Sequence, residues 1–378
     1  MTDGEMKDDY KRIAVFLPSL AGGGAERVMV TLANGFATRG VPVDLVVVAA
    51  EGAYLADVSP RVRLVELGAS RVLFSLPALV RYLRRERPYA LLSALNHANI
   101  IALWARKLAR SGTRLVVSER NTLSRDVSNS RFKRGLPWLM RLSYSSADAI
   151  VAVSSGVADD LAQTARLPRE RIDVVYNPIN SNLPRLSEAP VVHPWLAEGE
   201  PPVIVAAGRL TVQKDFATLV EAFAMVRQTH RARLVILGEG ELRATLEARI
   251  AELGIAEDVA LPGFVDNPYP WMRKASLFVL SSAWEGFCNV LAEAMACGTP
   301  VVSTDCPSGS AEILEDGKWG RLVPVGDASA LARAMAATLS DETHPDVRHR
   351  ARSFNLQQAL SGYLHALRVP LPQEHRCE

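Results

Sequence analysis

The fold can be read from residues 11–37, KRIAVFLPSLAGGGAERVMVTLANGFA. Residues 11–17 have the length of a buried strand, and the last five of them are apolar. A glycine-rich turn at Gly22–Gly24 follows. The apolar spacing then predicts an amphipathic helix from about Glu26 to Ala37. A buried strand, a glycine turn and a helix form the repeating unit of a parallel sheet covered by helices.

The same unit recurs along the chain and predicts two domains of this class. Helices are predicted over 76–87 and 99–109. Strands are predicted over 41–49, 89–93, 114–118 and 149–154, and then, after a proline-rich stretch at 182–202, near 203–208, 233–237, 259–261, 277–280 and 299–303.

The sequence therefore predicts an α/β protein with two Rossmann-like, doubly wound parallel-sheet domains that face each other across a cleft. We expect an N-terminal domain over 1–185 and a C-terminal domain over 186–355. A last helix within 356–378 is expected to pack back on the N-terminal domain.

The composition is that of a soluble globular protein. Of its residues, 48% are hydrophobic and 22% are charged. A chain of 378 residues is too long for one hydrophobic core of ordinary size, which favours two domains. A net charge of +2 gives no global field for nucleic acid, so no nucleic-acid partner is expected. The cysteines lack the close paired spacing of a zinc site and are expected to be free thiols: Cys288, Cys297, Cys306 and Cys377.

No targeting or membrane-spanning segment is expected. The first ten residues are acidic and lack the basic and apolar regions of a secretory signal. The longest apolar runs, such as 45–50, are far shorter than the roughly 20 residues that span a bilayer. These features predict a cytoplasmic protein.

Two glycine-containing loops follow predicted strands and suit phosphate. In Gly22–Gly24 the backbone can approach a ligand at a helix start, although the spacing fits neither a P-loop nor a dinucleotide fingerprint, and a plain tight turn is the alternative. The loop after residue 208 brings Arg209 and Lys214 together, and such cations suit a diphosphate. The alternative is two solvated surface cations.

The most informative block is Ser281–Val302, which contains a strand end, a helix entered through glycine and a further strand. Its acids Glu285 and Glu293 are eight residues apart, or roughly 12 Å along a continuous helix. That exceeds the ~5 Å at which two carboxylates flank one glycosidic bond, so they should contact different parts of an elongated ligand such as a nucleotide sugar. Two exposed acids on an ordinary amphipathic helix are the alternative.

Four segments together resemble glycosyltransferase family 4, whose members are retaining enzymes of the GT-B fold. The resemblance covers nearly the whole chain, and the segments are 22–27, 208–214, 263–265 and the block 285–302 with its Glu-x7-Glu pattern. It implies a GT-B glycosyltransferase that moves a sugar from a nucleotide diphosphate donor.

The resemblance also implies a role for each matching position. Arg209, Lys214 and Glu285 are the expected catalytic residues: the two cations would hold the donor diphosphate, and Glu285 would contact sugar hydroxyls. Glu293 would bind the ribose. The remaining donor-binding positions are Gly23 and Gly24 near the phosphate, the backbone of Phe264 and Val265 at the base, and the amides of Phe287, Cys288, Asn289 and Val290 at the phosphate or sugar. From the residues alone, Phe264 could also be a core aromatic.

No metal and no cofactor other than the nucleotide-sugar co-substrate are expected. Members of the family do not depend on an Asp-x-Asp site, and the two cations can replace the electrostatic role of a metal. The resemblance implies attack from the face that the phosphate leaves, with a phosphate oxygen accepting the proton of the acceptor.

The sequence gives weaker signals for the residues that face the acceptor. Glu119 follows a predicted strand and could orient the acceptor hydroxyl, cap a helix or form an ion pair. His97 stands at a strand-to-helix junction and could face the acceptor or be a structural histidine.

Residues 305–312, DCPSGSAE, are similar to a stretch of members that build lipid-linked or capsular glycans, with Ser310 in place of the usual proline. The resemblance implies a UDP-linked hexose or N-acetylhexosamine donor and a glycan or lipid-linked acceptor in cell-surface polysaccharide biosynthesis. The alternatives are a GT-B nucleotide-sugar epimerase and a catalytically silent nucleotide-sugar-binding subunit.

Peripheral contact with the inner membrane is a further hypothesis. Segments 70–87 and 131–141 combine cations with bulky apolar residues, as a protein on anionic lipid would. The alternative is helices that bury one face within their own domain.

Overall fold

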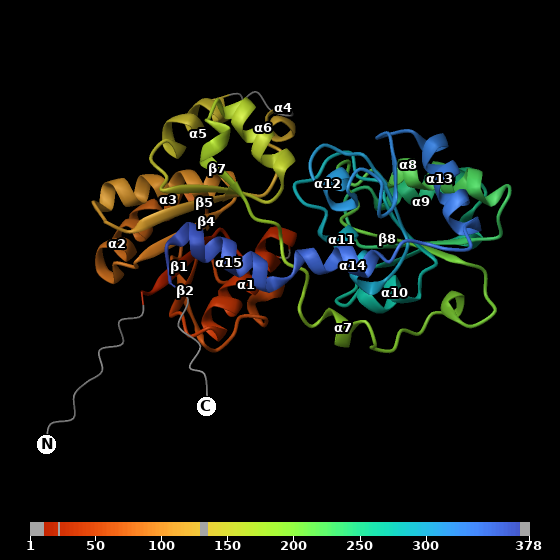
Figure 1. Cartoon of the computed structure of the whole chain (residues 1–378), viewed down its shortest axis with the longest axis horizontal. Helices are drawn as coiled ribbons and strands as arrows, with labels where there is room; N and C mark the ends of the chain where they lie inside the picture. Colours follow the sequence, from red (N-terminus) through yellow and green to blue (C-terminus); the bar gives the residue numbers. More distant parts are fainter. Residues whose placement is uncertain (1–10, 22, 129–134, 371–378) are drawn as a thin grey trace, which may run out of the picture. The chain divides into compact units, whose positions relative to one another are not determined.

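The computed structural model describes residues 11–21, 23–128 and 135–370, and these form two compact units (Figure 1). The first unit comprises the chain up to Val153, Ala158–Val175 and the chain from Leu356. The second comprises Ser154–Val157 and Tyr176–Asn355. The main division therefore falls after Val175, whereas the proline-rich composition had suggested residue 185.

The first unit is built on a seven-stranded sheet in the order β3-β2-β1-β4-β5-β6-β7, and all its paired strands are parallel. The strands are β1 (Ile13–Leu17), β2 (Val43–Val47), β3 (Val62–Glu66), β4 (Ala90–Ala94), β5 (Arg114–Glu119), β6 (Ala149–Ala152) and β7 (Ile172–Val174). The helices are α1 (Gly24–Thr38), α2 (Leu76–Glu86), α3 (Asn96–Ala109), α4 (Leu123–Ser128), α5 (Leu136–Tyr144), α6 (Ser155–Ala165, whose first residues belong to the second unit) and α15 (Leu356–Leu367).

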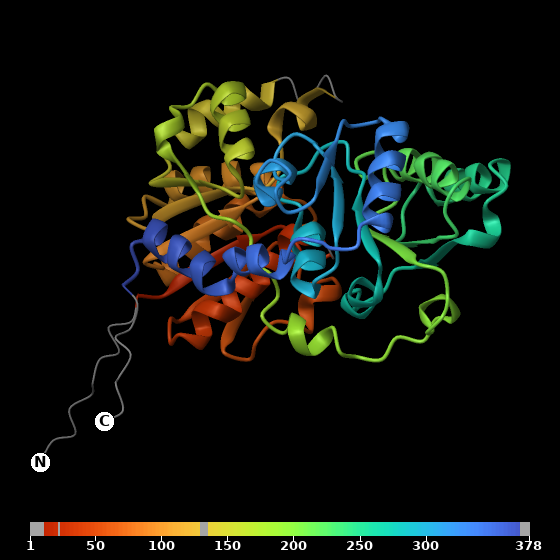
Figure 2. The same ribbon diagram turned by 45° about the vertical axis from the view of Figure 1, so that its right-hand side comes forward.

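Helices cover both faces of this sheet because its central strands are apolar on both sides. Alternate residues of β1 pack against α1 and α15 in one continuous core. Figures 1 and 2 show α15, in blue, lying beside α1, in red. The close approach depends on Gly35, where a Cβ atom would lie 2.7 Å from Leu360 Cδ1. The other face is covered by α3, which packs against α2 and α5.

The second unit has a six-stranded parallel sheet in the order β10-β9-β8-β11-β12-β13. Its strands are β8 (Val203–Ala207), β9 (Arg233–Leu237), β10 (Val259–Gly263), β11 (Leu277–Leu280), β12 (Val301–Thr304) and β13 (Arg321–Val323). Its helices are α7 (Leu183–Leu186), α8 (Phe216–Arg227), α9 (Arg243–Glu252), α10 (Tyr269–Lys274), α11 (Asn289–Cys297), α12 (Ser310–Leu314), α13 (Ala328–Ser340) and α14 (Val347–Ala351).

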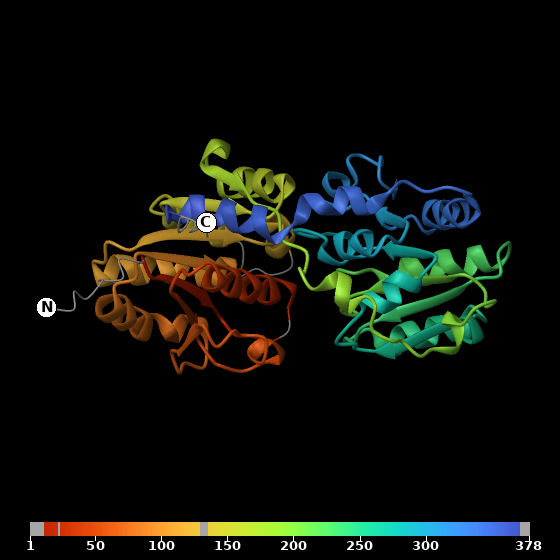
Figure 3. The ribbon, with the colours of Figure 1, turned by 60° about the horizontal axis from the view of Figure 1, so that its bottom comes forward.

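Helices also cover this sheet on both sides, as Figure 3 shows. One side packs against α8, α9 and α13 in a single core, and the other contacts α10 and α11. Side-chain caps fix the starts of α8 and α13: Asp215 accepts a hydrogen bond from the Thr218 amide and Asp327 from the Ala330 amide. Gly298, in the left-handed region with φ +87°, ends α11.

Among the residues that the structure describes, no helix is long and apolar enough to cross a membrane. Cys288, Cys297 and Cys306 are free and buried. Cys377, the fourth predicted free thiol, lies outside the described residues.

Candidate active site

The candidate site of the second unit lies where the sheet order reverses. β8 lies between β9 and β11, so the chain winds away from β8 in both directions along the sheet. Open parallel sheets bind ligands beyond the carboxyl ends of their strands at such a point. Loop 208–215 leaves β8 there and loop 281–288 leaves β11, and these loops carry the three residues that the sequence predicted to be catalytic.

Lys214 and Glu285 form an ion pair and hydrogen bond between these two loops. Their side chains are only 18% and 8% exposed, and the Ser282 hydroxyl donates a further hydrogen bond of 2.7 Å to the same carboxylate oxygen. An ammonium has three N–H groups, so the bond to Glu285 leaves others that can donate to a phosphate. A cation and a carboxylate therefore lie side by side at the point where a ligand is expected.

The electrostatics of the site keep this lysine charged. Burial lowers the pKa of Lys214, but the negative charge of Glu285 and the hydrogen bond to it outweigh burial, so the pKa lies above its ordinary value. Lys214 is consequently an ammonium throughout the neutral pH range, which is the state that binds a diphosphate.

Three hydrogen bonds fix the backbone on either side of the ion pair. The Ser281 hydroxyl donates to the Lys214 carbonyl at 2.8 Å, and the Ala283 amide donates to the Gln213 carbonyl at 2.8 Å. The side-chain amide of Gln213 donates to the Trp284 carbonyl at 3.0 Å. Because the two loops are bound to each other, the charged groups are held in place before any ligand arrives.

The loops after β8 and β9 approach each other so closely that glycine is required. A Cβ atom on Gly238, which has a φ of +142°, would lie 1.9 Å from the Gly208 carbonyl oxygen. A Cβ atom on Gly240 would lie 2.4 Å from the Leu210 carbonyl oxygen, while the Leu210 amide donates to the Glu239 carbonyl at 2.8 Å. These contacts give loop 208–215 a rigid support on its second side.

Other predicted donor-binding residues lie at the same edge of the sheet. The Arg209 side chain is exposed on the loop after β8, and Phe264 and Val265 follow β10. Phe264 is 67% exposed, so the alternative of a core aromatic is wrong. Its ring is free to contact a ligand.

Glu285 and Glu293 are both buried, at 7% and 3% exposure, so the alternative of two exposed acids is wrong. The Tyr269 hydroxyl donates to Glu293 at 3.3 Å. The roughly 12 Å helical spacing expected between the two glutamates does not apply. It assumed one continuous helix, whereas α11 begins at Asn289 and Glu285 lies in the preceding loop.

The predicted amide donors form the entry to α11. Phe287 and Cys288 are buried, and Asn289 and Val290 are partly exposed. The Asn289 amide already donates to the Phe287 carbonyl at 2.9 Å, so it is engaged within the loop rather than presented to a donor. Burial raises the pKa of the Cys288 thiol well above its ordinary value, so this side chain is neutral.

In the first unit the sheet order reverses between β1 and β4. Gly23 and Gly24 follow β1 and open α1, as the sequence predicted. A Cβ atom on Gly23 would lie 2.2 Å from a Glu26 carboxylate oxygen, so a carboxylate already lies over the start of this helix. Gly22, part of the expected phosphate cradle, lies outside the described residues.

The two predicted acceptor-side residues have different surroundings. Glu119 ends β5 and is 2% exposed, and its carboxylate accepts hydrogen bonds from the Asn99 amide at 2.8 Å and from the Tyr144 hydroxyl. Burial, reinforced by the charge of Glu119, raises the pKa of Tyr144 well above its ordinary value. His97 is exposed at the start of α3, with its Nδ1 atom 3.2 Å from the side-chain oxygen of Asn96.

Comparison with known proteins covers both units. A family model described as Glycosyltransferase Family 4 matches residues 22–183, and one described as Glycosyl transferases group 1 matches residues 201–341. A Campylobacter jejuni protein, N-acetylgalactosamine-N,N'-diacetylbacillosaminyl-diphospho-undecaprenol 4-alpha-N-acetylgalactosaminyltransferase, is 32% identical over 344 residues, which are 88% of this chain and 91% of that protein. The chain belongs to glycosyltransferase family 4.

One further relative and one solved structure are similar to this family 4 glycosyltransferase over most of its length. The lipopolysaccharide core biosynthesis glycosyltransferase LpsE of Rhizobium meliloti is 29% identical, with 85% of this chain and 87% of that protein covered. Anabaena Alr3699/HepE, solved in complex with UDP and glucose, superposes with a TM-score of 0.79 at 21% identity over 95% of this chain and 100% of that chain. The predicted GT-B fold is confirmed.

Sequence reasoning overlooked the polar residues that support the site of this family 4 glycosyltransferase. Gln213, Ser281 and Ser282 hold the ion pair and its loops. Their only signal was adjacency to the predicted residues in loops at strand ends.

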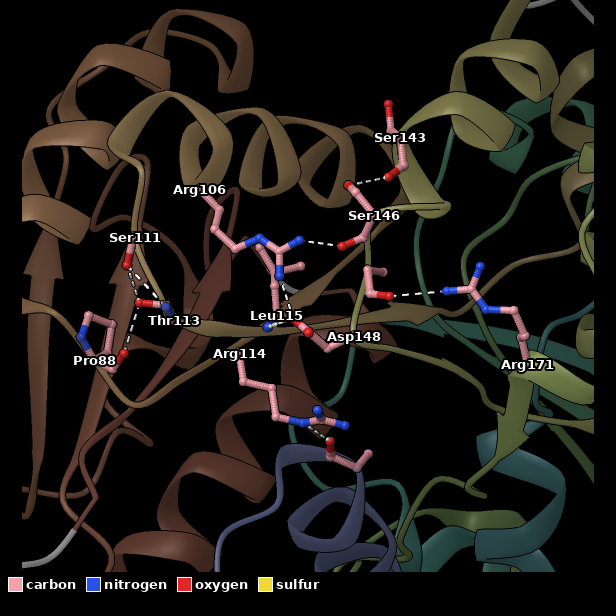
Figure 4. A network of polar contacts seen from close by, with 12 residues as sticks. Pro88, Arg106, Ser111, Thr113, Arg114, Leu115, Ser143, Ser146, Asp148 and Arg171 are labelled. Carbon is pink, nitrogen blue, oxygen red and sulfur yellow. Dashed lines mark hydrogen bonds and ion pairs between the residues drawn. The ribbon is translucent and has the colours of Figure 1, made fainter.

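A cavity of about 610 Å³ lies at the opposite, amino-terminal edge of the first sheet of this family 4 glycosyltransferase. Arg114 Nε donates to the Ala366 carbonyl of α15 at 2.7 Å, and Asp148 accepts from the Leu115 amide at 2.8 Å and from Arg106 (Figure 4). None of the predicted site residues lines this cavity. Its contacts hold the end of α15 on the sheet, and we assign it no part in transfer.

Proposed function

We propose that this family 4 glycosyltransferase transfers a hexose or N-acetylhexosamine from a UDP-sugar to a glycan or lipid-linked acceptor, with retention and without a metal. The product would serve cell-surface polysaccharide or glycoconjugate biosynthesis. The observation that carries this proposal is the buried Lys214–Glu285 pair at the reversal point of the second sheet.

The pair fits a nucleotide sugar because it places a cation for the diphosphate beside a hydrogen-bond acceptor for the sugar hydroxyls. A diphosphate needs cations, which Lys214 and the exposed Arg209 supply from the loop after β8. Sugar hydroxyls need an acceptor, which the Glu285 carboxylate supplies from the loop after β11. The charge of Lys214 would also stabilise the negative charge that grows on the departing phosphate.

The transfer step we propose takes place on one face of the sugar. The bond between the anomeric carbon and the β-phosphate oxygen breaks as the acceptor oxygen bonds to the same carbon from the same side. The acceptor proton passes to the departing phosphate oxygen. The protein contributes position and charge stabilisation, and Glu285 acts on the sugar hydroxyls rather than as a nucleophile.

The proposed substrates rest on the relatives. The names of the similar proteins from C. jejuni and R. meliloti describe a glycosyl acceptor on diphospho-undecaprenol and a lipopolysaccharide core. The Anabaena structure was solved with UDP and glucose. A UDP-sugar donor and a lipid-linked acceptor are the choice most consistent with both.

Donor binding tests the proposal directly. We expect UDP or UDP-sugars, but not GDP or ADP conjugates, to raise the melting temperature and to bind in calorimetry with a Kd of about 1 µM to 1 mM, whether or not EDTA is present. Transfer to an undecaprenyl diphosphate-linked saccharide should give a product with the anomeric configuration of the donor, as read by NMR.

Each other outcome contradicts a named part of the proposal. A preference for GDP or ADP overturns the donor, and an inverted product overturns retention. Loss of activity in EDTA that Mg²⁺ restores overturns metal independence. Interconversion of sugar nucleotides without acceptor indicates an epimerase, and binding with neither transfer nor hydrolysis indicates a silent subunit.

A membrane-bound acceptor would give a role to exposed apolar side chains of the first unit. Large apolar side chains 53–66% exposed lie on the 3₁₀ turn Val72–Ser75, on α3 and on α5: Leu73, Phe74, Leu108, Trp138 and Leu142. These elements pack on one another, and exposed arginines accompany them: Arg81, Arg84, Arg85 and Arg141. We propose that these apolar and basic side chains contact anionic lipid, while α2 still buries Leu79, Tyr82 and Leu83 in the domain. Residues 131–134 of the segment first singled out lie outside the described residues.

Replacing Phe74 and Trp138 by serine should lower sedimentation with phosphatidylglycerol vesicles at least about tenfold, because two inserting side chains each contribute over 1 kcal/mol. Activity on a water-soluble acceptor should be unchanged. Val192→Ser, at a site 96% exposed in the second unit, is the matched control. Undiminished sedimentation of the double variant, or equal binding to phosphatidylcholine vesicles, would remove the membrane hypothesis.

A further inference from the structure

The loop that carries Glu285 into α11 is held by the segments through which the chain passes between its two units. Three such segments belong to the second unit: 154–157, the start of 176–355 and its end. We name residues 285–289 the donor loop. Each of the three segments contacts at least one residue of this loop. None of the three is adjacent to the donor loop in sequence.

The first contact orients a peptide group of the donor loop. The Ser154 hydroxyl, which is completely buried, donates to the Gly286 carbonyl at 2.7 Å. A peptide unit is planar with its N–H opposite its C=O, so fixing this carbonyl also fixes the direction of the Phe287 amide. That amide is one of the proposed donor contacts.

The second contact holds the first residue of α11. The side-chain amide of Asn177, at 4% exposure, donates to the side-chain oxygen of Asn289 at 2.9 Å. Asn289 in turn donates its backbone amide to the Phe287 carbonyl. Asn177 therefore acts on the same turn as Ser154, from the other end.

An aromatic cluster supports the middle of the donor loop. The Phe287 ring lies 5.9 Å from the ring centre of Tyr176 and 5.4 Å from that of Phe354, and these two rings meet edge to face at 5.6 Å. The Tyr176 hydroxyl donates to Glu312, whose carboxylate also accepts from the Ser155 amide at 2.9 Å and 3.0 Å. Two passing segments are thereby joined to each other as well as to the loop.

Glu285 is connected to the segment 154–157 indirectly, through Pro307 and Ser308 in the loop after β12. The Glu285 amide donates to the Pro307 carbonyl at 3.3 Å. At Gly156 a Cβ atom would lie only 2.8 Å from Ser308 Cα, so the segment packs directly against the next residue of that loop. Gly286, Phe287 and Asn289 thus each contact a segment at a unit boundary, and Glu285 is connected to one through residues 307–308.

We propose that Ser154, Asn177 and the Tyr176–Phe354 ring pair are positioning residues that set the donor loop for the sugar, although none of them contacts the donor. This inference rests on the proposed function, since it takes the loop to bind a nucleotide sugar. It predicts that removing these contacts lowers the affinity of the protein for a UDP-sugar more than its affinity for UDP.

The test compares Ser154→Ala and Asn177→Ala with Ser187→Ala, a matched control in the same unit. Ser187 is also buried and its hydroxyl also donates to a backbone carbonyl, that of Pro184 at 2.9 Å. We expect all three substitutions to lower the melting temperature by a similar amount, about 2 to 4 °C. Only the first two should weaken UDP-sugar binding, by about fivefold to twentyfold, while UDP binding changes less than twofold.

Two further measurements separate positioning from a general loss of structure. Ser154→Thr keeps the hydroxyl and should recover at least half of the lost affinity. In the alanine variants kcat should fall more than the apparent affinity for UDP, since the amide direction matters most when charge develops.

The inference is overturned if Ser154→Ala and Asn177→Ala match Ser187→Ala in UDP-sugar affinity and kcat. It is also overturned if UDP and UDP-sugar lose equal affinity. Failure of the proposed function is recognised separately, because the unsubstituted protein would then bind no nucleotide sugar at all.

Discussion

Lys214→Met is expected to lower turnover about 10²- to 10³-fold, because it removes one charged contact to the phosphate that departs. It should also lower the free energy of unfolding by about 3 kcal/mol, since Glu285 keeps its burial but loses its counter-charge. Methionine is chosen because it retains most of the length of the lysine stem, so packing against Gly208 is preserved. Steady-state kinetics and urea unfolding measure the two effects.

The double variant Lys214→Met, Glu285→Gln separates catalysis from stability. A neutral amide at 285 carries no unpaired charge, so most of the lost stability should return while turnover stays low. Recovery of turnover along with stability would mean that Lys214 serves only to neutralise Glu285, and the assignment of a catalytic lysine would be abandoned. Normal turnover in the single variant would have the same consequence.

Gly238→Ala is expected to destabilise the second unit by about 4 kcal/mol and to abolish donor binding. An added Cβ atom would lie 1.9 Å from the Gly208 carbonyl oxygen, which is backbone and cannot rotate away. The left-handed backbone adds its own cost of about 1–2 kcal/mol for a residue with a Cβ. Relief requires the loops after β8 and β9 to separate, and the first of these carries Lys214.

Gly254→Ala provides the control because it isolates the backbone cost. Gly254 has a φ of +69°, lies in the same unit and has no atom within 4 Å of an added Cβ. We expect it to lose only about 1–2 kcal/mol and to bind donor normally. Equal losses for the two variants would show that the close approach of the two loops contributes nothing to stability.

The central strands could be predicted because they are short apolar runs between turn residues. Val203–Ala207 is completely apolar and forms β8, as expected. The edge strands β3, β7 and β13 were missed, because they are partly exposed. The burial of Val62–Glu66, for example, falls off after its first residue, and Leu64 is 37% exposed. Half-solvated strands carry too weak an apolar signal to be distinguished from loops.

The candidate site was predicted as a set of residues but not as an arrangement. Strand-end loops rich in glycine, cations and acids pointed to Lys214 and Glu285, and the structure places both at the reversal point of the sheet. Their contact joins residues 71 positions apart and depends on how two loops are bonded, which no local pattern encodes. The start of α11 at Asn289 was hidden for a similar reason, because Glu285–Cys288 is held outside the helix by residues distant in sequence.

The return of α15 to the first unit constrains how such genes can recombine. The core of that unit includes Leu360, Tyr363 and Leu364, which follow the second unit in the sequence, and Leu360 packs directly on Gly35. A single crossover between two relatives inside residues 176–355 would combine the first unit of one parent with the last helix of the other. Exchange of residues 176–355 as a cassette therefore needs two crossovers, near residues 175 and 355, and it still leaves Ser154–Val157 of the second unit with the other parent.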